Sequence, residues 1–144
     1  MFEDDDLIRQ MLEKALERLG CEVQSYANPG LCPLMREEAC PCQLARVCAD
    51  LIISDLNMPA ISGLELVASL QKHGCRLQRY LLASGSWSEA QKESARRMGC
   101  EVVEKPFDLE FIRNWVNQCR LSIDPGRSLI DWESDTEADA RRAR

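Results

Sequence analysis

The sequence has no surplus of positive charge and no long hydrophobic run. Its 144 residues carry 18 Lys and Arg against 24 Asp and Glu, a net charge of −6. A surface that binds nucleic acid needs a basic face, so this balance predicts no DNA partner. No stretch approaches the roughly 20 apolar residues that cross a bilayer, and the acidic start lacks the layout of a signal peptide. We therefore expect a cytoplasmic protein without a membrane partner.

Histidine is nearly absent, whereas cysteine is plentiful. The one histidine, His73, precedes Gly74 at the predicted end of a helix, where we expect an exposed side chain rather than a ligand or catalyst. There are eight cysteines. Because disulfides are rare in the cytoplasm, we expect reduced thiols or metal ligands. The length and the apolar content of 45% suit one domain with a full hydrophobic core.

Predicted strands and helices alternate along the chain. Apolar residues at helical spacing predict helices over Asp6–Leu19, around Leu64–Leu70, from Ser86 to Met98 and after Asp108. Strands are predicted over 21–26, 51–54, 79–83 and 101–104, and short helices over 34–39 and 44–48. Such alternation predicts an α/β fold of three layers, with a parallel sheet covered on both faces.

Two helix starts carry capping signals, and the pattern fades near the C-terminus. Ser86 with Glu89 three residues later reads as a capping box, and Asp108 reads as an N-cap. From Ser122 onward most residues are charged or small, which predicts a mobile tail, although Leu129, Ile130 and Trp132 offer a way to dock on the domain.

Polar residues follow the predicted strands at the point where each ends. Asp55, Ser84 and Lys105 close three of the runs, and the acidic residues 3–6 open the chain. The carboxyl ends of parallel strands meet at one edge of a sheet, where open α/β sheets place their ligands. Carboxylates, a hydroxyl and an ammonium gathered there predict a site for a divalent cation and a phosphoryl group.

Four motifs occur in a fixed order: Glu3-Asp4-Asp5, Ser54-Asp55-Leu56-Asn57-Met58-Pro59 with Gly63, Ala83-Ser84-Gly85, and Lys105-Pro106-Phe107. Together they resemble the receiver domain of bacterial two-component response regulators, over about residues 2–119. The resemblance implies a doubly wound, flavodoxin-like (βα)5 fold with the parallel strand order 2-1-3-4-5. The receiver domain would span residues 1–121, with a cysteine-rich insertion at about 28–50, and residues 122–144 would form the tail.

The resemblance also implies roles for the residues of these motifs. Asp55 would accept a phosphoryl group from a sensor histidine kinase or a phosphotransfer protein. Glu3, Asp4, Asp55 and the backbone carbonyl of Asn57 would bind Mg2+. Ser84 and Lys105 would contact the phosphoryl group, and Lys105-Pro106 matches the family's cis peptide bond. Apart from its own phosphotransfer and dephosphorylation, such a domain is not an enzyme.

Two departures from the family pattern concern the first strand and the output step. Only Met1 and Phe2 precede Glu3, so the first strand is truncated, and we expect the true start to lie upstream. Val102 stands where the family has an aromatic switch residue, three positions before Lys105. A valine cannot swing between exposed and buried rotamers, so the output step would use loop movement or another aromatic such as Trp87.

The third departure is a group of cysteines in the insertion. Cys32, Cys40, Cys42 and Cys48 fall within a short segment broken by prolines. They are a candidate site for Zn2+ or an iron–sulfur cluster, although the close Cys40-Pro41-Cys42 spacing is not the usual zinc pattern. Redox-sensitive thiols and plain packing are the alternatives. We expect the other four cysteines to be core residues: Cys21, Cys75, Cys100 and Cys119.

The sequence thus predicts a stand-alone receiver that signals through protein contacts. The expected contact face carries the helix after Ser86 and the strand that ends at Lys105. One alternative is a receiver-like scaffold that works without phosphorylation, which the short first strand and Val102 favour. Another is a metal or thiol sensor built on the Cys32–Cys48 segment. A related aspartyl-phosphate phosphatase is disfavoured, because such enzymes carry a second aspartate where this chain has Asn57.

Overall fold

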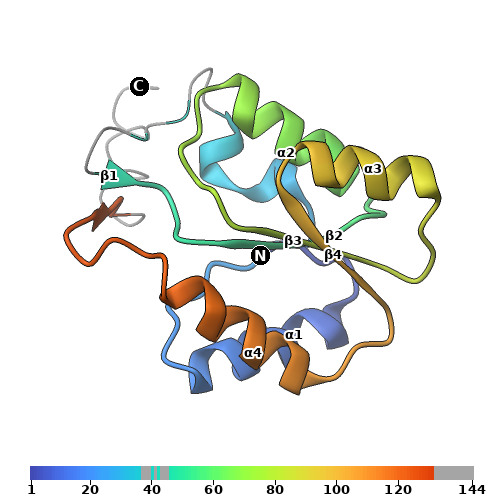
Figure 1. Cartoon of the computed structure of the whole chain (residues 1–144), viewed down its shortest axis with the longest axis horizontal. Helices are drawn as coiled ribbons and strands as arrows, with labels where there is room; N and C mark the ends of the chain where they lie inside the picture. Colours follow the sequence, from blue (N-terminus) through green and yellow to red (C-terminus); the bar gives the residue numbers. More distant parts are fainter. Residues whose placement is uncertain (37–39, 41, 43–45, 132–144) are drawn as a thin grey trace.

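Figure 1 shows a computed structural model of the chain, which describes residues 1–36, 40, 42 and 46–131. The elements in chain order are α1 (Asp6–Arg18), η1 (Pro29–Leu31), η2 (Pro33–Arg36), β1 (Arg46–Val47), β2 (Ile52–Asp55), α2 (Gly63–Lys72), β3 (Tyr80–Ser84), α3 (Glu89–Arg97), β4 (Cys100–Glu104), α4 (Leu109–Arg120) and β5 (Ser128–Leu129). Among the described residues, no helix is long and apolar enough to cross a membrane.

The central sheet is parallel, as the alternation of elements predicts. Its three strands lie in the order β2-β3-β4, with Asp55 beside Ala83 and Ser84 beside Glu104. Every residue of β2 and β3 is buried, which explains why both begin as apolar runs and have polar residues only at their ends, Ser54 and Asp55 in β2 and Ser84 in β3.

The first two strands of the order 2-1-3-4-5 are reduced to single bridges. Phe2 forms parallel bridges with Tyr26 on one side and with Ser54 on the other. The predicted strand over 21–26 is therefore wrong except at Tyr26. Met1 bonds to the backbones of Gln24 and Tyr26, and Glu3 bonds to that of Tyr26, so the short segment Met1 to Glu3 reaches only the end of the predicted strand.

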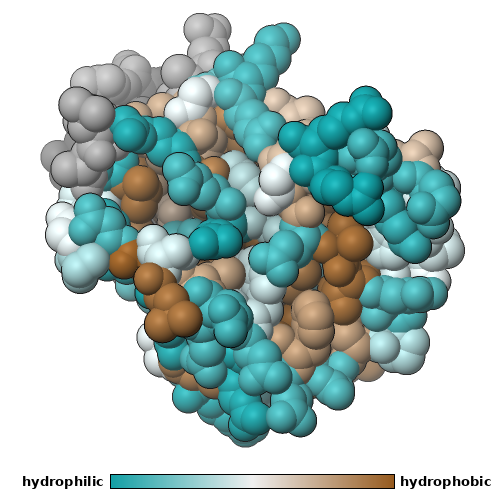
Figure 2. Space-filling view, in the orientation of Figure 1, coloured by the Kyte–Doolittle hydropathy of each residue, from teal (hydrophilic) through white to brown (hydrophobic). Residues whose placement is uncertain are grey.

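Helices cover both faces of the sheet, α2 and α3 on one side and α1 and α4 on the other (Figure 1). Neighbouring residues of β3 point to opposite faces, so Leu82 packs with Leu66 of α2 and Leu81 packs with Ile112 of α4. Figure 2 shows hydrophilic side chains over the outer surface of α3. That helix buries only Ala95.

Side-chain caps fix the starts of the four α-helices. Asp5 caps α1, Ser62 caps α2 with Glu65 in a capping box, and Asp108 caps α4 as predicted. The predicted box of Ser86 with Glu89 is wrong, because Ser88 caps α3 with Gln91. Both backbone groups of Ser86 are instead engaged with the hydroxyl of Ser84.

The cysteine-rich segment and the C-terminal segment meet at the edge of the molecule. Arg46–Val47 pairs in parallel with Ser128–Leu129, so the predicted helix over 44–48 is wrong for its described residues. The predicted helix over 34–39 is a 3-10 turn where it is described, and residues 37–39 lie outside the described part.

The first part of the predicted tail is docked on the domain. Arg127 holds Asp50 through two hydrogen bonds of 2.7 and 2.6 Å, and Ile130 is buried. The prediction of a mobile tail is therefore wrong for residues 127–130. Trp132 and the rest of the predicted tail lie outside the described residues.

Candidate functional site

Four polar side chains meet at the carboxyl edge of the sheet, as the sequence predicts. Asp55 and Ser84 end β2 and β3, Lys105 follows β4, and Glu3 follows the bridge at Phe2. Glu3 and Ser84 are only 3% and 0% exposed, and Asp55 is 9% exposed. Groups so far from water require partners: Glu3 and Asp55 find theirs in Lys105, and Ser84 finds its own in Asn57 and Ser86.

Lys105 lies at the centre of the site. Its Nζ is 2.8 Å from Oε2 of Glu3 and 3.3 Å from Oδ1 of Asp55. The Lys105-Pro106 peptide bond is cis, as the resemblance implies, and the backbone N–H of Lys105 donates to the carbonyl of Ser84. The ammonium group therefore joins the start of the chain to the ends of two strands.

Gly63 allows the loop after Asp55 to close tightly. A Cβ at this position would lie 2.7 Å from the backbone oxygen of Asp55, closer than real Cβ contacts come. The N–H of Gly63 donates to the carbonyl of Leu56 at 2.8 Å, which holds the start of α2 against the end of β2. The loop of residues 56–62 is thereby folded back over the sheet edge beside Asp55.

The pKa values of the three charged groups reflect their burial. Burial raises the pKa of Asp55, and Lys105 partly offsets this effect. Burial likewise raises the pKa of Glu3 against the hydrogen bond from Lys105. For Lys105, burial lowers the pKa, but the hydrogen bond to Glu3 and the charge of Asp55 raise it overall. Burial thus raises the pKa of both carboxyl groups, and contact with them raises the pKa of the ammonium.

Three carboxylates form a donor set that suits a small hard cation. Oxygen atoms of Glu3, Asp4 and Asp55 all lie within 4.8 Å of one another. Mg2+ prefers oxygen ligands and keeps several waters, so this number of carboxylates is sufficient. Asp4 is exposed, so one side of the set is open to solvent. The residues present therefore fit Mg2+, while the backbone carbonyl of Asn57 stays a predicted ligand.

The Ser84 hydroxyl connects the site to the β3–α3 loop. It accepts from the Asn57 amide at 3.1 Å and donates to the carbonyl of Ser86 at 2.7 Å. Next in the chain, Trp87 donates its indole N–H to the carbonyl of Val103 at 3.0 Å. Val102 packs against the core on the α2–α3 side of the sheet. The loop beside Ser84 is thus tied to β4 through Trp87.

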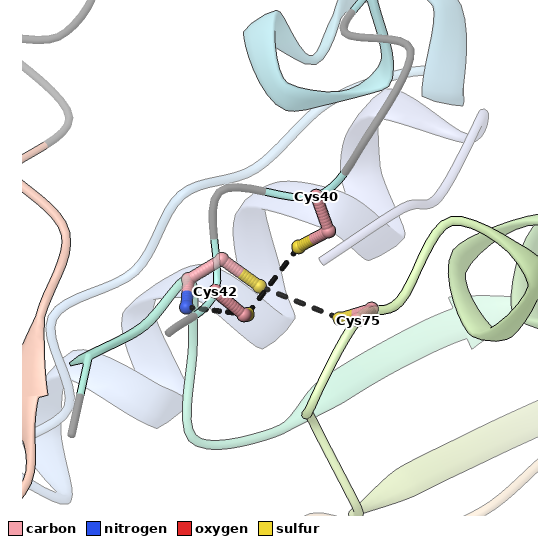
Figure 3. A group of neighbouring side chains, drawn as sticks. Cys40, Cys42 and Cys75 are labelled. Atoms are coloured by element: carbon pink, nitrogen blue, oxygen red, sulfur yellow. Dashed lines mark hydrogen bonds between the residues drawn. The ribbon is translucent and has the colours of Figure 1, made fainter. Parts of the chain in front are cut away.

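The predicted cysteine group is only partly correct. Sulfur atoms of Cys40, Cys42, Cys48 and Cys75 lie within 4.8 Å of one another (Figure 3). Cys32 instead packs in the core with Phe2. Sequence analysis missed Cys75 because its place in the group depends on a contact between distant parts of the chain.

Comparisons with known proteins agree with this fold. Residues 1–117 match the family described as response regulator receiver domain. The chain belongs to this family, and it is a domain of two-component signalling. Receiver domains interact with histidine kinases or phosphotransfer proteins, and they bind Mg2+ in their acidic pocket.

Among proteins of similar sequence is the DNA-binding transcriptional regulator NtrC of Azospirillum brasilense, 32% identical over 88% of this chain and 25% of the relative. The transcriptional regulatory protein FixJ of Azorhizobium caulinodans is 29% identical over 98% of this chain and 59% of the relative. The chain thus spans about a quarter of one relative and three fifths of the other. That it is stand-alone and that it binds no DNA stay predictions.

Solved structures of receiver domains share the fold. The chemotaxis protein CheY4 of Vibrio cholerae has a TM-score of 0.64 at 25% identity, covering 82% of this chain and 93% of that one. The receiver domain of NtrX from Brucella abortus has a TM-score of 0.65 at 20% identity, covering 85% and 97%.

Proposed function

We propose that this chain accepts a phosphoryl group on Asp55 from a sensor histidine kinase or a phosphotransfer protein, with Mg2+ bound by Glu3, Asp4, Asp55 and the carbonyl of Asn57. The observation that carries the proposal is the arrangement around Asp55: an ammonium 3.3 Å from its Oδ1 and two further carboxylates beside it at one sheet edge. A surface aspartate would have neither the cation-binding group nor the ammonium.

In the transfer step a carboxylate oxygen of Asp55 attacks the phosphorus. The new bond joins Asp55 oxygen to phosphorus, and the bond between phosphorus and the donor's imidazole nitrogen breaks, so the electron pair stays on the imidazole. Mg2+ supplies positive charge that offsets the phosphoryl oxygens. Lys105 neutralises another of these oxygens, because its Nζ already lies within reach of Asp55.

Ser84 is the group through which we propose the phosphoryl is sensed. Its hydroxyl proton, now given to the carbonyl of Ser86, turns to a phosphoryl oxygen. The carbonyl of Ser86 then loses its donor, and the β3–α3 loop shifts together with Trp87. We propose that this shift alters the face of α3 and β4 and hence the affinity for a downstream protein, with Trp87 acting in place of the aromatic absent at Val102.

A scaffold that works without phosphorylation remains the competing function. It is favoured by Val102 and by the short first strand. Burial of Glu3 and Asp55 beside one lysine speaks against it, because such a site weakens the fold without serving a purely structural need. Retaining these groups makes sense when they react.

Incubation with Mg2+ and acetyl phosphate tests the proposal. We expect intact-protein mass spectrometry to show the addition of one phosphoryl group, which Asp55→Asn abolishes. Asp108→Asn is the matched control: it makes the same chemical change at an N-cap where Asn serves equally well, so it should still be phosphorylated. A folded wild-type protein that gains no phosphoryl group would overturn the proposal. Slow loss of the label, without turnover of any other substrate, is expected of a non-enzyme.

A further inference from the structure

Four cysteines form a second cluster at the opposite end of the sheet from Asp55. Cys48 precedes β2 and Cys75 precedes β3, so both lie near the amino ends of strands whose carboxyl ends carry the acidic site. Cys40 and Cys42 come from the insertion. Figure 3 shows Cys40, Cys42 and Cys75 turned toward one another from these separate segments.

The distances between the sulfur atoms suit one shared metal ion. The Sγ atoms of Cys40 and Cys42 are 3.3 Å apart, those of Cys48 and Cys75 are 3.6 Å apart, and all four lie within 4.8 Å of one another. With metal–sulfur bonds of about 2.3 Å, the sulfurs of a tetrahedral zinc site lie about 3.8 Å apart. The cluster therefore needs only small movements to match that tetrahedron.

Disulfide pairing and iron–sulfur clusters fit these distances less well. A disulfide requires sulfurs about 2.05 Å apart, and none of the eight cysteines, all in the described part of the chain, is paired in this way. An iron–sulfur cluster places irons and sulfide between its cysteines and so holds thiolates on different irons farther apart than one ion does. A single ion with four soft ligands in a tetrahedron is the natural occupant, and zinc is the common choice.

We propose that Cys40, Cys42, Cys48 and Cys75 bind one Zn2+ ion as four thiolates. The four thiols lose their protons to solvent on binding, and no electron is transferred. Four protein ligands leave no open position for substrate, so the ion is structural rather than catalytic.

Backbone contacts already hold the cluster together. The N–H of Cys48 donates to Sγ of Cys42 at 3.4 Å, the kind of outer contact that orients and stabilises a metal-bound thiolate. The N–H of Cys40 donates to the carbonyl of His73, and that of Cys75 to the carbonyl of Leu70. The insertion is thereby attached to the C-terminal end of α2, where the bound ion would fasten it.

The role we infer for the ion is to fix the insertion to the domain. Cys32, Met35 and Ala49 of the insertion pack against the core, whereas Cys40 and Cys42 belong to neither core cluster. A zinc ion shared by the four thiolates would fasten Cys40 and Cys42 to the domain, as in small zinc domains. The inference is independent of phosphorylation at Asp55, because the two sites lie at opposite ends of the sheet.

Metal analysis of the full chain purified in reducing, oxygen-free buffer tests the proposal. We expect about one zinc per chain, falling below about 0.1 in Cys75→Ser, because a closed four-ligand site loses its affinity with one ligand. Cys32→Ala is the matched control: Cys32 is buried outside the cluster, so its removal should leave the zinc in place. Circular dichroism of each variant establishes that it is folded.

A second measurement needs no variant. Titration of the wild-type protein with a thiol-reactive mercurial should release one zinc to an indicator dye as four thiols react, and Co2+ in place of zinc should give the absorption of a tetrahedral thiolate site. The proposal would be overturned by a wild-type protein that holds less than about 0.1 zinc per chain or as much iron as zinc. It would also be overturned by a mass two hydrogens lower, which indicates a disulfide, or by zinc retained in folded Cys75→Ser.

Discussion

Asp55 and Glu3 are two carboxyl groups held away from water with a single ammonium between them. Lys105 is 2.8 Å from one and 3.3 Å from the other, yet burial still raises the pKa of both carboxyls. The attraction of one lysine thus does not offset the loss of hydration of two carboxylates. Asp55, the residue that we propose accepts the phosphoryl group, is therefore also a source of instability in the fold.

We predict that Asp55→Asn raises the free energy of unfolding at neutral pH. The folded pKa of Asp55 lies above its unfolded value, so its charged form weakens the fold at every pH above the folded pKa. This penalty shrinks as pH falls through the folded pKa and is gone below the unfolded value of about 3.9. Denaturant unfolding at a series of pH values should show that the difference in free energy of unfolding between Asp55→Asn and the wild type becomes smaller as pH falls.

Asp108→Asn serves as the control for this pH series. Asp108 caps α4 at an exposed position, so the variant should follow the wild-type curve within about 0.5 kcal/mol near neutral pH. The prediction is contradicted if Asp55→Asn destabilises the protein at neutral pH, or if its gain in free energy of unfolding over the wild type grows as pH falls. Either result would mean that the charge of Asp55 does not weaken the fold.

Single residues divide sharply into those that sequence predicts and those that it does not. Asp55, Ser84 and Lys105 were predicted because each follows an apolar run, and the ends of parallel strands must meet. Cys75 was not predicted as a partner of Cys40, because nothing in the local sequence indicates which loops meet at the opposite edge. The local sequence pattern determines where a residue lies on its strand. The residues that it contacts in space depend on how the elements pack together.

The start of helix α3 depends on which of two serines acts as its N-cap. Ser86 and Ser88 each have a Glu or Gln three residues later, so both fit the capping-box pattern. The helix begins after Ser88, because the backbone of Ser86 is engaged with Ser84. Sequence pattern alone does not separate the two, since the deciding contact comes from the end of another strand.

We predict that Ser88→Ala lowers the free energy of unfolding by about 1 kcal/mol, the usual cost of losing an N-cap. Ser86→Ala is the matched control and should cost less than about 0.5 kcal/mol, since the contacts of Ser86 are made by its backbone. Urea unfolding of both variants gives the comparison. Equal losses, or a greater loss at Ser86, would contradict this assignment of the cap.

Elements that pair with distant segments were predicted least well. Residues 46–47 were predicted as part of a helix over 44–48 but form β1, because β5 lies alongside them. Residues 127–130 read as tail yet are docked. In both cases the partner is some 80 residues away, and propensity is a weak guide where tertiary pairing decides. The strongly patterned elements β2, β3 and α1 were predicted nearly to their bounds, and α4 was predicted at its start.

On the scale of the whole molecule, residues 127–130, which follow α4, belong to the folded domain. The segment 127–130 pairs through β5, holds Asp50 through Arg127 and buries Ile130. The family match ends at residue 117, so the docked segment 127–130 lies beyond the part of the domain that matches the family. This segment packs beside the cysteine-rich insertion, because its partner strand β1 is part of that insertion.

We predict that Ile130→Ala destabilises the protein by about 2–5 kcal/mol, the range for deleting a buried aliphatic side chain. Leu129→Ala is the control, because Leu129 is 42% exposed and its truncation should cost much less. Thermal unfolding followed by circular dichroism compares the two. A loss below 1 kcal/mol at Ile130 would mean that the segment contributes little to the fold in solution.

The contact between Glu3 and Lys105 joins residues 102 positions apart in sequence. No fragment of the chain that ends before β4 can bring the two together, and contacts between such distant residues form late because long loops must close first. During synthesis, Asp55 therefore emerges well before the lysine that accompanies it. The ammonium that we propose contacts the phosphoryl group is thus the last part of the site to be made, and a chain that ends before Lys105 lacks it.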